Sequence, residues 1–92
     1  MTWAVTVSEF EGMKRNAFYI GSATKDVWLG NPSKKFRFQI TRVPGGVPAI
    51  RFLLFRGNEV VVTLTHEASF EEVRDCMEGF VNYELVSGIM LL

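Results

Sequence analysis

The chain has 92 residues, ten of them Lys or Arg and ten Asp or Glu, so its formal net charge at pH 7 is zero. This length predicts a single domain over residues 1–92. The balanced charge argues against a general nucleic-acid binder, which needs surplus cations to displace the counterions around phosphates. No apolar run reaches the roughly 20 residues of a membrane span, and the N-terminus lacks the basic residues of a signal peptide. We therefore expect a cytoplasmic protein that does not contact membranes.

The first third of the chain predicts an N-terminal hairpin. Residues 2–10 alternate apolar and polar side chains, which is the period of a strand with one buried face. Residues 11–16 are polar and fit a turn, and residues 17–23 are rich in aromatic and β-branched side chains, which favour a second strand. Residues 24–33 show no clear period, although residues 30–33 have the composition of a loop.

Three further strands are predicted in succession, over residues 35–43, 49–56 and 59–65. The first has strictly alternating side chains, and the Pro- and Gly-rich stretch that follows it is typical of a turn. Gly57 and Asn58 fit a two-residue hairpin loop between the second and third strands.

A helix is predicted to begin at Ser69. Ser69 is a good N-cap, and Glu72 three residues later completes a capping box. Gly79 weakens the helix, so we expect it to end near Asn82. For the remaining segment we favour a last strand from about Leu85, with a longer helix capped by Gly88 as the alternative.

These elements predict an α+β fold. We expect an antiparallel sheet of four to six strands, one helix from the C-terminal region packed on one face, and the N-terminal hairpin beside or over the sheet.

The turns also predict which side chains share a face of the sheet. A four-residue loop after Val43 and a two-residue loop after Arg56 place the following residues on a core face: Phe36, Phe38, Ile40, Leu53, Phe55, Val60, Val62 and Leu64. Arg51 would also lie on this face, as a misfit, and a one-residue change in the Pro-Gly loop would move its first-strand partners to the other face. The opposite face would carry Lys35, Arg37, Gln39, Thr41, Ile50, Phe52, Leu54, Arg56, Glu59, Val61, Thr63 and Thr65.

That second face combines an apolar strip with flanking cations, which allows three interpretations. The N-terminal segment covers it, or a protein partner binds it, or single-stranded nucleic acid stacks on it. We favour a protein partner over nucleic acid because no RNA-binding motif is present. The predicted partner-binding residues are Lys35, Arg37, Gln39, Phe52, Leu54 and Arg56.

Candidate catalytic chemistry is sparse. Cys76 is the only cysteine and His66 the only histidine, so a disulfide within the chain and the common zinc sites are excluded. No nucleophile or base has an identifiable orienting partner. We therefore expect no enzyme activity, metal or cofactor, and instead a small binding protein of the inhibitor or adaptor type. The apolar surplus, the apolar strip on the second face and the C-terminal sequence "GIMLL" also favour a homodimer.

Overall fold

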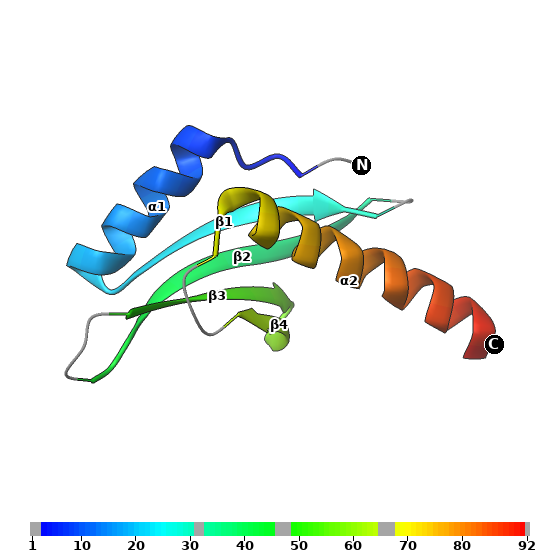
Figure 1. Ribbon diagram of the computed structural model, residues 1–92. Helices are drawn as coiled ribbons and strands as arrows, with labels where there is room; N and C mark the ends of the chain where they lie inside the picture. Colours follow the sequence, from blue (N-terminus) through cyan, green and yellow to red (C-terminus); the bar gives the residue numbers. More distant parts are fainter. Residues whose placement is uncertain (1–2, 31–32, 46–48, 65–67, 92) are drawn as a thin grey trace.

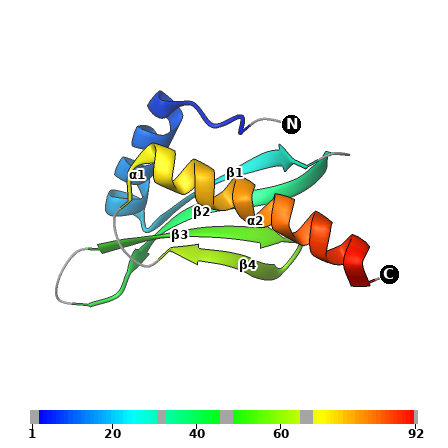
Figure 2. The ribbon, with the colours of Figure 1, turned by 45° about the vertical axis from the view of Figure 1, so that its right-hand side comes forward.

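A computed structural model describes residues 3–30, 33–45, 49–64 and 68–91, with residues 83–91 described by their backbone alone. The elements follow in the order α1 (Val7–Ile20), β1 (Ser22–Leu29), β2 (Lys34–Val43), β3 (Ala49–Arg56), β4 (Glu59–Leu64) and α2 (Phe70–Leu91). The four strands form one antiparallel sheet in the order β1-β2-β3-β4. Both helices lie on the same side of this sheet (Figures 1 and 2). The predicted α+β class and antiparallel sheet are confirmed.

The N-terminal hairpin prediction is wrong, because this segment forms helix α1. Thr6 and Glu9 make a reciprocal capping box: the Thr6 hydroxyl accepts from the Glu9 N–H at 3.1 Å, and a Glu9 carboxylate oxygen accepts from the Thr6 N–H at 3.0 Å. The helix ends at Gly21, whose φ of 114° suits a residue without a Cβ. Its buried residues lie on one stripe: Phe10, Met13 and Ala17.

Helix α2 begins where the sequence predicts but continues further. The Ser69 hydroxyl accepts from the Glu72 N–H, and a Glu72 carboxylate oxygen accepts from the Ser69 N–H, both at 3.1 Å. The helix then runs to Leu91 and extends past the sheet (Figures 1 and 2), so the strand expected from about Leu85 is wrong. A single Gly costs a helix only about 1 kcal/mol, and Gly79 does not end this one. Consecutive helical hydrogen bonds satisfy the backbone locally, whereas a last strand would need a free sheet edge.

The register of the sheet differs from the prediction by one residue. Val43 pairs with Ala49, so five residues separate them instead of four, and Ile40 lies opposite Phe52. Because side chains alternate along a strand, this shift exchanges the two faces of β3. Phe52 and Leu54 are completely buried, and Arg51 lies on the other face. The misfit of Arg51 in the expected core was a sign of the true register.

A bulge brings β4 into agreement with this arrangement. Phe55 pairs with Val60 as the turn predicts, but Leu54 pairs with Val62, so β4 contributes one extra residue at Val61. Bulges of this kind accommodate an unmatched residue without moving the rest of a strand to the wrong face. Val62 and Leu64 therefore pack against the core as expected.

The core lies between the sheet and the two helices. The Phe10 ring of α1 stacks on Phe52 at 5.6 Å and on Phe38 at 6.4 Å, and meets Phe70 of α2 edge-on at 5.5 Å. Trp3 packs edge-on against Phe38 at 5.1 Å. The N-terminal segment and both helices thus share one core on one side of the sheet.

Candidate interaction face

The other side of the sheet has no layer of described residues over it. We call it the open face, and its residues are Thr24, Asp26, Trp28, Lys35, Arg37, Gln39, Thr41, Arg51, Leu53, Phe55, Val60 and Thr63. One interpretation had the N-terminal segment covering the face with the cations. That interpretation is wrong, because Trp3 and Phe10 pack on the opposite side against Phe38.

The pairing of the strands places these side chains in rows across the sheet. One row runs Asp26, Arg37, Phe55, Val60, and the next runs Thr24, Gln39, Leu53, Thr63. Trp28 lies opposite Lys35 near one end of the sheet, and Thr41 lies opposite Arg51 toward the other. Because directly opposite side chains are about 5 Å apart at Cβ, the first row brings charged and apolar groups together and the second brings polar and apolar groups together.

Arg37 and Phe55 form the best-defined contact of the open face. The Arg37 guanidinium lies over the Phe55 ring at 4.4 Å from its centroid. Such cation–π contacts at partly exposed sites are worth about 0.5–1 kcal/mol. The contact holds a positive group above an aromatic ring and covers that side of the ring.

The apolar part of the open face remains accessible. Trp28 is 47% exposed and Val60 is 45% exposed, and Leu53 and Phe55 are half-buried between them and the polar residues. Trp and Arg are the residue types that most often dominate the energy of protein interfaces. An exposed Trp and two Arg on one uncovered sheet therefore have the composition of a binding surface.

The predicted site residues divide into two groups. Lys35, Arg37 and Gln39 lie on the open face as expected, and Arg56 is exposed at the turn, where it donates to Glu59 at 3.1 Å. Placing Phe52 and Leu54 with them was wrong, because the one-residue register shift turns both into the core. Whether the outward residues bind a partner stays a prediction.

Sequence reasoning missed seven residues of the open face: Arg51, Leu53, Phe55, Val60, Thr24, Asp26 and Trp28. The first three were missed because β3 is apolar on both faces, so its alternation gives no direction. Trp28 lay in a segment without a clear period. Its neighbours Val27 and Leu29 are both buried, and that two-residue spacing was the available signal.

The rest of the described chain offers little catalytic chemistry. Its residues contain no group of three or more His, Cys, Asp or Glu that could hold a metal. His66 lies outside the described residues. None of the helices in the described ranges has the length and apolar character that a bilayer crossing requires.

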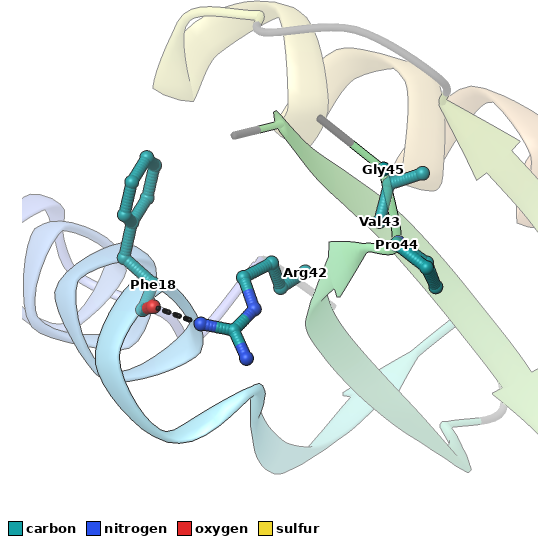
Figure 3. Close-up of a pocket in the computed structure, with 5 residues that line it drawn as sticks. All are labelled: Phe18, Arg42, Val43, Pro44 and Gly45. Carbon is teal, nitrogen blue, oxygen red and sulfur yellow. Dashed lines mark hydrogen bonds between the residues drawn. The ribbon is translucent and has the colours of Figure 1, made fainter. Parts of the chain in front are cut away.

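A pocket of about 350 Å³ lies where α1 ends beside the β2 end (Figure 3). It is lined by Phe18, Arg42, Val43, Pro44 and Gly45. The Arg42 Nη1 donates to the Phe18 carbonyl oxygen at 2.9 Å. Arg42 therefore satisfies one of the carbonyls left free at a helix C-terminus. Among the described residues that line the pocket, Arg42 is the charged one, and this hydrogen bond gives it a structural role.

Comparison with known proteins adds no assignment: no protein-family model, curated protein or solved structure matches the chain.

Proposed function

We propose that this protein is a non-catalytic binding protein of the inhibitor or adaptor type, which docks a partner protein on the open face. The observation that carries the proposal is an exposed Trp28 on the same uncovered sheet as Val60 and the Arg37–Phe55 pair. A soluble domain normally buries such groups or uses them. Apolar and aromatic groups bordered by cations are typical of the centre and rim of a protein interface.

Single-stranded nucleic acid is the second candidate, because Trp28, Lys35 and Arg37 share this face. Binding of that kind relies on free aromatic rings for base stacking. One side of the Phe55 ring is already occupied by Arg37, and the whole chain has no net positive charge. Both facts favour a protein partner.

Site-specific photo-crosslinking tests the proposal. A photoreactive benzoylphenylalanine replaces Trp28 in one variant and Tyr19 in a matched control. Tyr19 is an aromatic residue of α1 that is 80% exposed, well away from the open face. Irradiation in a lysate of the native cells should give a discrete adduct with another protein from position 28 and none from position 19.

Three results would contradict this expectation. Equal crosslinking from both positions would place the function elsewhere. A nuclease-sensitive adduct from position 28 would favour the nucleic-acid alternative. An adduct of twice the chain mass would mean that the open face pairs two copies.

A further inference from the structure

The two arginines in the middle of the open face have N–H groups that nothing in the described chain satisfies. The Nε atoms of Arg37 and Arg51 are both buried and have no hydrogen-bond partner. Asp26, the single carboxylate of the open face, lies opposite Arg37 in the strand pairing, but its ion pair is with Lys35, whose Nζ is 3.9 Å from an Asp26 oxygen. The open face therefore holds two guanidinium groups that are not balanced by its single carboxylate.

An N–H that has lost water without gaining a partner raises the free energy of the unbound protein. Arg presents Nε and one Nη as a fork that matches the two oxygens of a carboxylate. A carboxylate that draws the guanidinium outward would satisfy these donors and remove that cost. Binding a carboxylate is thus favoured twice, by the new charged hydrogen bonds and by relief of the unpaired ones.

The register places the two arginines at a defined spacing. Arg37 lies opposite Phe55 and Arg51 lies opposite Thr41, with Gln39 and Leu53 as the row between them. Four residues along β2 from Arg37 to Thr41 correspond to about 13 Å. An extended chain has the same rise per residue, so its residues i and i+4 lie on one face about 13 Å apart and match this separation.

We propose that the partner presents an acidic extended segment, with Asp or Glu at positions i and i+4 and an apolar residue at i+2. The two carboxylates pair with Arg37 and Arg51, and the apolar side chain packs on Leu53 between them. This inference rests on the proposed function and specifies the chemistry of its partner.

Charge complementarity also argues against a second copy as the occupant. A symmetric pair brings the same patch of both subunits together. Lys35, Arg37 and Arg51 of one copy would then face the same cations of the other, with only Asp26 to oppose them. Like charges at an interface oppose association.

The test is selection from a random twelve-residue peptide phage library on the immobilised full chain. The same selection is made on an Arg37→Gln, Arg51→Gln variant and on Arg15→Gln. Arg15 is exposed on α1, so its replacement removes a positive charge away from the open face. Thermal melting confirms that both variants are folded.

The wild type and Arg15→Gln should enrich peptides with two acidic residues four apart and an apolar residue between them. The arginine variant should not enrich them. Changing either acid of a selected peptide to its amide should weaken binding about tenfold or more, as expected for a hydrogen bond to a charged group.

Other outcomes separate this inference from the proposed function. Neutral peptides that bind the arginine variant normally, but not a Trp28→Ser, Leu53→Ser variant, would overturn the acidic-segment inference and leave the open face as a binding surface. Peptides that bind every variant alike would overturn both. A twelve-nucleotide oligothymidylate serves as the last competitor. If it competes with every selected peptide and binds more tightly than any of them, the ligand of the arginines is the phosphate chain of a nucleic acid and the acidic-segment inference is wrong.

Discussion

Phe52 and Phe55 are three residues apart on β3 and lie on opposite faces of the sheet, so substitutions at the two positions test the assignment of the faces. Phe52 is fully buried against Phe10, whereas Phe55 is half-buried beneath Arg37. Phe52→Ala should therefore lower the free energy of unfolding by about 3–5 kcal/mol, because it leaves a cavity in the core. Phe55→Ala should cost less than half as much. Urea unfolding measures both values. A larger loss of stability for Phe55→Ala than for Phe52→Ala would contradict the observed register and support the one in which Phe52 faces outward.

The contact between Arg37 and Phe55 should give a measurable energetic coupling between these two residues. In a double-mutant cycle, Arg37→Ala and Phe55→Ala should show a coupling of about 0.5–1 kcal/mol. The contact distance of 4.4 Å sets this expectation. Arg51 and Phe55, on the same strand but without a ring contact, form the control pair and should be additive. A coupling indistinguishable from the control would mean that the guanidinium does not rest on the ring in solution.

At the scale of elements, the cap of α1 predicts how stability depends on pH. The Lys25 ammonium and then the Thr6 backbone N–H lower the pKa of Glu9 from its ordinary value of 4.5. A carboxyl group whose pKa is lowered by folding stabilises the folded state above its unfolded pKa, and this contribution is lost as pH falls through the folded pKa. The melting temperature of Glu9→Gln should thus lie below that of the wild type at neutral pH and approach it in acid below pH 4.5.

Glu11→Gln is the matched control for that experiment. Glu11 lies on the same helix outside the capping box, with its carboxylate 3.7 Å from Lys14 Nζ. Its replacement removes the same charge without touching the cap. A difference between wild type and Glu9→Gln that stays constant from pH 7 to pH 3 would contradict the assigned role of the ionised carboxylate.

The helix cap also shows how much of each element the sequence could predict. Ser69 with Glu72 correctly predicted the start of α2, and Thr6 with Glu9 is the same signature before α1. The Thr6–Glu9 capping box was overlooked because residues 3–7 alternate in the manner of a strand. The alternation does reflect the structure, but only over a few residues. Trp3 and Val5 are both buried, whereas Val7 is the first residue of the helix and is 54% exposed.

The strands were more predictable than their pairing. Strict alternation from Lys35 to Thr41 gave the bounds of β2 to within one residue and its buried face, because Phe36, Phe38 and Ile40 alternate with polar residues. Since β3 is apolar on both faces, only the loop length could decide its register, and a difference of one residue reversed it. Local patterns therefore predicted β2, β3, β4 and the start of α2, while a connection without a distinctive turn placed half of the candidate site residues off the open face.

At the scale of the whole molecule, placing two helices on one side of a four-stranded sheet gives a core and an uncovered face. Phe52 and Leu54, which the sequence placed in a binding surface, belong to the core, and Arg51 and Trp28 lie on the open face instead. The prediction of an outward face with cations and apolar groups survives this exchange, although half of its members changed. An error in register therefore changes which residues lie on the outward face, but it does not change the presence of such a face.

The expected homodimer loses two of its three reasons. The apolar strip of Ile50, Phe52 and Leu54 is core, and the C-terminal segment to Leu91 belongs to a helix instead of an edge strand. The remaining reason is the surplus of apolar residues, which on the open face leaves Trp28 47% exposed and Val60 45% exposed. A stable dimer usually buries at least about 1,200 Å² in total, and here the cations around these side chains would meet their own copies.

We therefore predict that the isolated chain is a monomer at low ionic strength. Light scattering at micromolar concentration should give a mass near 10.4 kDa. Added salt screens the repulsion between exposed like charges, so the same measurement in 1 M salt tests whether charge is what keeps two open faces apart. The double variant Lys35→Gln, Arg51→Gln should then associate more readily than the wild type at low salt, whereas the Arg15→Gln variant should not. A mass near twice the chain mass for the wild type at low salt would contradict the prediction, and the open face would then be an interface between copies.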